Sequence, residues 1–223
     1  MTTLFDLAHE DDALPALHQA HAALTRGEVV VVPTDTVYGI AVSPGTPGAI
    51  DTVVGLKGRT RDMAPPILVA NLEQVAPLVA EGALSENVQA LLQRYWPGAL
   101  TVVLPVNPSI PFDIGHTPGT IALRSPDDQS LLELLRLHGP LAVTSANRTG
   151  EPPCQSVFEA INTFGDDVAV YLGAARDSTT DHLPSSIVDA TELISGGMAL
   201  SLIREGAISA AALAEAGYEV SAA

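Results

Sequence analysis

Short apolar runs rich in β-branched residues alternate with helical patterns along the chain, and this alternation restricts the possible folds more than any other feature. Strands are predicted at residues 29–32, 67–70, 100–106, 121–124, 141–144, 168–172, 187–188 and 200–204. Helices are predicted at residues 14–24, 46–56, 85–94 and 129–138. Asn71 and Gln74 have the pattern of a capping box that opens another helix, and Thr46 is the expected N-cap of the helix at 46–56. The alternation predicts an α/β fold with a twisted mixed β-sheet flanked by helices, without giving the strand order.

The length and composition fit one domain. The 223 residues are 47% hydrophobic, which is enough for one core, so we predict a single domain over residues 1–223. The N-terminus lacks a basic segment followed by an apolar run, and no apolar stretch reaches the roughly 20 residues that cross a bilayer. We therefore expect a cytoplasmic protein without membrane contact. The one cysteine, Cys154, excludes an intrachain disulfide and is interpreted as an ordinary free thiol.

The charge balance narrows the possible ligands. Acidic residues outnumber basic ones by 26 to 10, and the formal net charge is −16. Phosphate backbones are held largely by Lys and Arg, so this balance argues against general electrostatic binding of nucleic acid. Five of the ten basic residues nevertheless gather in three short segments: Lys57, Arg59, Arg61, Arg124 and Arg148. Scarce positive charge concentrated near strand ends is what a pocket for an anionic substrate needs.

Polar segments follow several predicted strands, and each has two interpretations. Residues 33–39 place two hydroxyls and a carboxylate where they fit a small polar ligand or a self-satisfying turn equally well. Residues 57–62 hold three cations and favour an anion site over a solvated loop. Arg124 ends a strand and could reach a cleft, or pair with one of the aspartates that follow it. Residues 144–150 suit nucleotide contacts or a helix cap.

The common nucleotide and metal signatures are missing from the sequence. There is no Gly-x-x-x-x-Gly-Lys-Ser/Thr loop and no Gly-x-Gly-x-x-Gly turn after a strand. His18 and His21 share a helix face, but no third ligand accompanies them, so no metal site is predicted. A nucleotide, if bound, would need a less common kind of site.

Seven short motifs in a fixed order resemble the YrdC-like family of threonylcarbamoyl-AMP synthases. They lie at residues 33–39 (Pro-Thr-Asp-Thr-Val-Tyr-Gly), 57–59, 96–101, 121–124, 145–150, 185–189 and 204–208, within a span of roughly residues 12–210. The resemblance implies a YrdC-like sheet with a concave, positively lined face. It also implies a reaction in which L-threonine, bicarbonate or CO2, and ATP give L-threonylcarbamoyl-AMP and pyrophosphate. Partner transferases would then pass the threonylcarbamoyl group to an adenosine of tRNA.

The resemblance also implies roles for individual residues. Lys57 and Arg59 are the implied catalytic residues, which hold the phosphates and the carbamate. The implied threonine ligands are Thr36, Arg124, Val143 and Ser185. The implied ATP ligands are Lys57, Arg59, Met63, Thr120, Ser145, Asn147 and Arg204. Mg²⁺ is expected to arrive with ATP, because the sequence shows no dedicated metal motif. The sequence departs from relatives at Met63, Ala64, Leu68, Pro153 and Ser186.

Two other functions remain open from the sequence. One is an RNA-binding or ribosome-associated module without catalysis, which the acidic charge balance disfavours. The other is a relative that forms a carbamoyl adenylate with a different acceptor. Such relatives usually carry zinc-finger and acylphosphatase-like parts, which this sequence does not contain.

Overall fold

The structure of the protein is a computed structural model that describes residues 2–7, 10–173 and 183–223. Within these residues the strands are β1 (Thr3–Asp6), β2 (Val30–Val32), β3 (Gly39–Val42), β4 (Ile67–Leu68), β5 (Leu100–Pro105), β6 (Thr120–Arg124), β7 (Leu141–Ser145), β8 (Val170–Gly173), β9 (Ser186–Asp189), β10 (Ala199–Arg204) and β11 (Glu219–Ala222). The helices are α1 (Glu10–Thr25), α2 (Ala49–Lys57), α3 (Leu72–Val75), α4 (Glu86–Tyr95), α5 (Gln129–His138), α6 (Val157–Phe164) and α7 (Ala210–Glu215), with short 3-10 turns η1 (Gly165–Asp167) and η2 (Thr191–Ser195).

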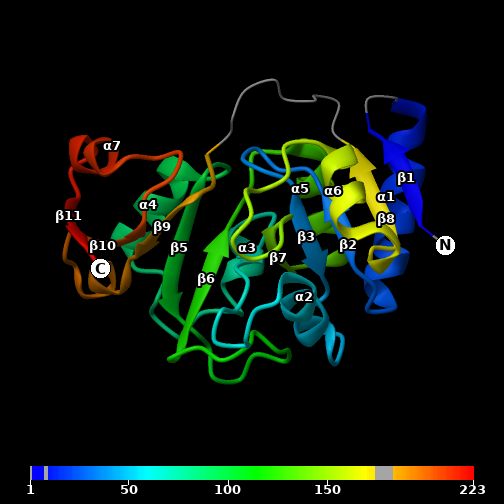
Figure 1. Ribbon diagram of the computed structural model, residues 1–223. Helices are drawn as coiled ribbons and strands as arrows, with labels where there is room; N and C mark the ends of the chain where they lie inside the picture. Colours follow the sequence, from blue (N-terminus) through cyan, green and yellow to red (C-terminus); the bar gives the residue numbers. More distant parts are fainter. Residues whose placement is uncertain (1, 8–9, 174–182) are drawn as a thin grey trace.

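The strands form one sheet in the order β1-β8-β2-β3-β7-β4-β6-β5-β9-β10-β11 (Figure 1). Parallel and antiparallel neighbours are mixed, since β4 runs parallel to β6 and antiparallel to β7. The predicted α/β class with a twisted mixed sheet is confirmed. Segments far apart in the sequence become neighbours in this order, because β3 pairs with β7 and β5 pairs with β9.

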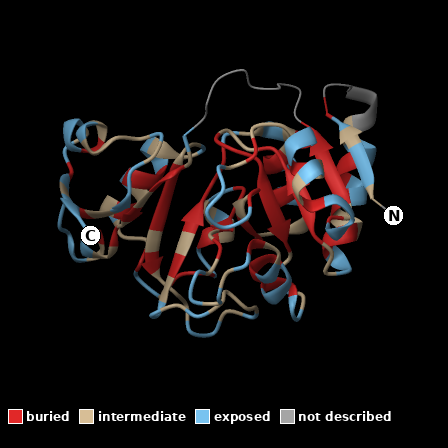
Figure 2. Ribbon diagram, in the orientation of Figure 1, coloured by how far each residue is buried: buried red, intermediate tan, exposed pale blue. Residues whose placement is uncertain are grey.

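Helices cover the two faces of the sheet unequally. On one face, α1 and α5 pack with their leucines against apolar side chains of β2, β3, β4, β7 and β8. On the other face, α2, α3, α4, α6 and α7 cover a larger apolar core that continues through β5, β6, β9 and β10. Buried strand residues run through the middle of the molecule between these helices (Figure 2). In the described part of the chain, the first face therefore lacks a covering helix over β6, β5 and β9.

Several local predictions can be compared with this fold. Helix α5 has its predicted bounds, and the predicted cap at Asn71 is confirmed because its side chain accepts the N–H of Gln74. The predicted cap at Thr46 is wrong. Helix α2 begins at Ala49 and is preceded by Gly48 in the left-handed region with φ of 80°, so the proline lies before the helix.

Among the described residues, three strands and two α-helices were not predicted: β1, β3, β11, α6 and α7. All of them are short, from four to eight residues, and short segments give weak periodic signals. No helix among the described residues has the length and apolar character that a membrane crossing requires.

Candidate active site

A cavity of about 440 Å³ lies on the sheet face that α1 and α5 leave uncovered. Its floor is made by alternate residues of the central strands. Ile121 and Leu123 of β6 enter the helix-covered core, whereas Ala122 and Arg124 of the same strand line the cavity. Thr101 of β5 lines it in the same way. The cavity therefore follows from the alternation of side chains on strands that are covered on only one face.

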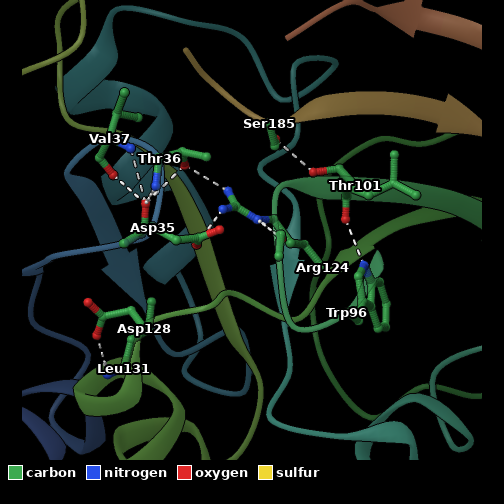
Figure 3. Close-up of polar contacts among 12 residues, drawn as sticks. Asp35, Thr36, Val37, Trp96, Thr101, Arg124, Asp128, Leu131 and Ser185 are labelled. Carbon is green, nitrogen blue, oxygen red and sulfur yellow. Dashed lines mark hydrogen bonds and ion pairs between the residues drawn. The ribbon is translucent and has the colours of Figure 1, made fainter. Parts of the chain in front are cut away.

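Arg124 is buried in this cavity and held by three groups (Figure 3). Its Nε donates to the carbonyl oxygen of Gly98 at 2.9 Å and its Nη1 to Oγ1 of Thr36 at 3.0 Å. Its Nη2 donates to Oδ1 of Asp35 at 2.5 Å, and the two side chains of this ion pair are 7% and 14% exposed. The alternative pairing of Arg124 with the aspartates that follow it is wrong, because Asp128 instead caps α5.

The turn that carries Thr36 satisfies its own backbone and also faces the cavity. Oγ1 of Thr34 accepts the N–H groups of Thr36 and Val37 at 3.0 and 3.2 Å and donates to the carbonyl of Val37 at 2.6 Å. Thr36 itself is buried and lines the cavity. The turn interpretation of residues 33–39 is therefore confirmed, and Thr34 and Thr36 both border the cavity. Binding of a polar ligand by this segment stays a prediction.

Val143 lines the cavity from β7, next to Gly39 of β3. A Cβ atom at Gly39 would lie 2.6 Å from Cγ1 of Val143. A larger residue at this position would push the valine side chain aside. The absence of a side chain at Gly39 thus preserves the shape of this wall.

Lys57 is buried at the C-terminal end of α2, beside the cavity. Its Nζ donates to the carbonyl oxygens of Ser145 and Asn147 and to Oδ1 of Asn147, the last two at 2.9 Å. Burial and the charge of Arg59 lower the pKa of Lys57 to about 7, and the electrostatic interaction with Cys154 opposes this shift. Ser145 lines the cavity, whereas Lys57 and Asn147 are not among its lining residues. The lysine therefore supports the loop that carries Ser145 and Asn147 without lining the larger cavity itself.

Arg204 reaches the cavity from β10 by way of a β-bulge. The pairing of β10 with β9 shifts register between Leu202 and Arg204, and such bulges re-aim side chains. Arg204 donates to the carbonyl of Ser185 through Nε at 3.1 Å and Nη2 at 2.7 Å, and to Oγ of Ser185 at 3.1 Å. That hydroxyl also lies 2.8 Å from Oγ1 of Thr101. Ser185 is thus fixed between β5 and β10.

Three arginines converge on the cavity: Arg59, Arg124 and Arg204. Desolvation lowers the pKa of Arg204 first, and repulsion from Arg124 and Arg59 lowers it further. Desolvation also lowers the pKa of Arg59. The described residues that line this cavity include no carboxylate. The cavity is therefore suited to anionic groups.

A smaller cavity of about 170 Å³ adjoins the first and shares Met63, Ala64 and Ala122 with it. Thr120 lines the smaller cavity. Asp62 and His116 also line it, and the distance between Nδ1 of the histidine and Oδ1 of the aspartate is 3.4 Å. Two of the expected nucleotide ligands, Met63 and Thr120, therefore lie in this second compartment.

Three of the five clustered cations do not line the larger cavity: Lys57, described above, Arg61 and Arg148. Arg61 pairs with Asp51 at 2.5 Å and with Asp113 at 2.6 Å, and so ties a distant loop to α2. Arg148 donates to the carbonyl of Thr163 at 3.2 Å, away from the cavity lining. The expectation that these two arginines help to form the anion site is wrong, because nearer partners engage them. Arg204 takes their place among the lining residues.

Sequence reasoning assigned no role to Gly98 or Thr101 and considered Asp35 only as a possible ligand group, whereas all three fix groups in the cavity. Thr101 carried a signal, since it is a polar residue within an apolar strand. Asp35 and Gly98 become meaningful only when Arg124 is placed beside them. Arg176, the remaining basic residue of the segment 174–182, lies outside the described residues.

Other reactive side chains lie away from the cavity lining. Cys154 is buried, and burial raises the pKa of its thiol. Nδ1 of His21 lies 3.1 Å from Nδ1 of His138, between α1 and α5. Over residues 2–7, 10–173 and 183–223, no group of three or more His, Cys, Asp or Glu side chains is placed to hold a metal ion.

Comparisons with known proteins identify relatives of this chain. The family model Sua5_yciO_yrdC, described as "Telomere recombination", matches residues 22–206. A protein of Mycobacterium tuberculosis (strain ATCC 25618 / H37Rv), provisionally named a threonylcarbamoyl-AMP synthase, is 37% identical over 96% of this chain and 95% of its own length. The threonylcarbamoyl-AMP synthase of Enterobacter sp. (strain 638) is 33% identical over 79% of this chain and 92% of its own length.

A solved structure is also similar. Sua5 of P. abyssi complexed with L-threonine superimposes with a TM-score of 0.85 at 25% sequence identity. The match covers 99% of this chain and 63% of the Sua5 chain, so this chain spans less than two thirds of that protein.

Proposed function

The chain belongs to the Sua5, YciO and YrdC family, and on that premise we propose that it is a threonylcarbamoyl-AMP synthase. The proposed reaction converts L-threonine, bicarbonate or CO2, and ATP into L-threonylcarbamoyl-AMP and pyrophosphate. The observation that carries the proposal is the convergence of Arg59, Arg124 and Arg204 on one cavity of about 440 Å³. Such a cavity can neutralise a carboxylate, a carbamate and a triphosphate together.

The amino acid would bind at the end of the cavity near β6 and β7. The guanidinium of Arg124 is fixed by Gly98, Thr36 and Asp35, and would take the threonine carboxylate. Thr36 and Ser185 would offer hydroxyls, and Val143 an apolar wall. Arg124 and Thr36 are already hydrogen-bonded to each other, so their geometry is set before a ligand arrives.

The nucleotide would extend from this end across both cavities. Arg59, Ser145 and Arg204 of the larger cavity would contact the phosphates, and Met63 and Thr120 would contact ATP in the smaller cavity. Lys57 and Asn147 would act by holding the loop that presents Ser145. Mg²⁺ enters the proposal as part of the substrate, bound to the ATP phosphates.

The chemistry requires positioning and charge neutralisation, without a covalent nucleophile. The neutral amine of threonine adds to CO2 and loses a proton, which gives a carbamate. A carbamate oxygen then attacks the α-phosphorus of ATP, and the bond from that phosphorus to the bridging oxygen of pyrophosphate breaks. The arginines would stabilise the negative charge that gathers on the phosphates. The product would be consumed by transferases that modify tRNA, in the cytoplasm.

Pyrophosphate release provides the test. We expect release that requires threonine, bicarbonate and ATP together. Arg59→Ala or Arg124→Ala should lower the rate about ten- to a hundredfold, because each removes a charge-assisted contact. Equal release in the absence of threonine, or full activity in both variants, would contradict the proposal.

A further inference from the structure

Arg59 borders the cavity, and the structure shows what holds it there. Its Nε donates to Oγ1 of Thr149 at 3.2 Å. No hydrogen bond or ion pair joins its two terminal nitrogens to the described residues, so their N–H groups remain available to an anion. The position of this guanidinium therefore depends on one hydroxyl outside the cavity lining.

The donor and acceptor roles of that hydroxyl are fixed. Oγ1 of Thr149 donates its hydrogen to the carbonyl oxygen of Lys57 at 2.7 Å. The backbone N–H of Thr149 donates to the same carbonyl at 3.1 Å. Because its single hydrogen is engaged, the hydroxyl oxygen can only accept from Arg59. One side chain thus links the end of α2 to the 145–149 loop and holds the arginine.

An Arg59 side chain without a fixed conformation would weaken the binding of an anion in the cavity. An arginine side chain has many rotamers, and fixing it in one of them before the ligand binds lowers the entropic cost of forming the complex. Arg124 is fixed by three partners and Arg204 by Ser185, whereas Arg59 has one. Losing its one partner should therefore change the orientation of Arg59 more than losing any one of three partners changes the orientation of Arg124.

We propose that Thr149 is a positioning residue, which orients Arg59 towards the phosphates bound in the cavity. The proposal rests on the proposed function for the identity of the anion. It requires a hydroxyl at position 149, and the methyl group of threonine has no part in it. The chain therefore offers a matched pair of variants: Thr149→Ser keeps the hydroxyl, and Thr149→Val keeps the shape without it.

Steady-state kinetics should separate the two variants. We expect Thr149→Val to lower kcat/KM for ATP about tenfold, the loss of one hydrogen bond to a charged group, with little change in KM for threonine. Thr149→Ser should stay within about twofold of the wild type. In an Arg59→Ala background, Thr149→Val should cause no further loss, because the hydroxyl acts through the arginine.

A binding measurement keeps the inference separate from the proposed activity. Isothermal titration with inorganic pyrophosphate should give wild-type affinity for Thr149→Ser and about tenfold weaker affinity for Thr149→Val. If the wild type binds pyrophosphate but releases none with threonine and ATP, the proposed function fails while this comparison still stands. Three results would overturn the inference: equal affinities for the valine variant and the wild type, equal damage by serine and valine, or additive losses in the double variant. Urea unfolding of each variant checks that the fold is retained.

Discussion

The buried pair between Arg124 and Asp35 supports a double-mutant cycle on stability. Arg124→Met removes the three donors that reach Gly98, Thr36 and Asp35, and leaves the Asp35 carboxylate only 14% exposed without its cation. Asp35→Asn keeps an oxygen acceptor of the same size but removes the negative charge. The double variant has neither charge in the cavity floor.

The expected magnitudes follow from burial. Removing one partner of a buried ion pair typically costs about 3–5 kcal/mol, which we expect for Arg124→Met. Asp35→Asn should cost about 1–3 kcal/mol, because the arginine keeps its carbonyl and hydroxyl acceptors. In the double variant no unpaired charge remains, so the total should fall short of the sum by about 2 kcal/mol.

Urea unfolding followed by far-UV circular dichroism measures the three free energies of unfolding. A matched control is the pair of Arg61 and Asp51, whose side chains are 29% and 60% exposed. Its cycle should give a coupling of about 0–1 kcal/mol, as exposed pairs do. If the losses at Arg124 and Asp35 add to within about 0.5 kcal/mol, the two charges do not interact as described and the reasoning is refuted.

Two further predictions concern the lysine and a close backbone contact. Burial lowers the pKa of Lys57 from 10.5 to about 7. Between pH 7 and pH 10.5 the lysine is therefore protonated in the unfolded chain but neutral in the folded protein. Because the unfolded state binds more protons in this range, the free energy of unfolding should rise with pH. Urea titrations across that range should show the rise in the wild type, and its persistence in Lys57→Met would contradict the assignment. At Gly206 a Cβ atom would lie 2.1 Å from the carbonyl oxygen of Pro184, so Gly206→Ala should destabilise the protein by about 1–3 kcal/mol in thermal unfolding. The control is Gly55→Ala in α2, because nothing lies within 4 Å of the new Cβ atom. This substitution should stabilise the protein by about 0.5–1 kcal/mol. Equal losses of stability in the two variants would refute the contact argument.

The sequence allowed the fold class and several local elements to be predicted because their signals are local. Helix α5 has a periodic leucine face with a cap at one end and glycine at the other, so its bounds could be read directly. The apolar run that ends in Arg124 indicated the strand β6, although it did not show that only one face of the strand is covered by helices. The strand order could not be predicted, because it depends on pairings such as β3 with β7 between distant segments.

A residue of the candidate site could be predicted only where its partner is near in the sequence or where the family resemblance implied its role. Arg61 lies in the same segment as Arg59, and Arg148 in the segment of Ser145, yet the partners of both arginines turn them away from the cavity. One of the two carboxylates that pair with Arg61 lies 52 residues later, at Asp113. The density of charge along a sequence therefore indicates an anion site but does not say which cations form it.

The electrostatics of the whole protein explain why the arginines need a cavity. A molecule with a net charge of −16 repels an anionic substrate at long range. At physiological ionic strength charges are screened beyond about 8 Å, so a phosphate inside the cavity responds mainly to the groups that line it. Those groups include Arg59, Arg124 and Arg204. Desolvation lowers the pKa of Arg204, and repulsion from Arg124 and Arg59 adds to this effect. An anion bound among these arginines relieves their repulsion. The favourable interactions therefore act on the phosphates and the carboxylate of the ligands, and hold these groups close together in the cavity.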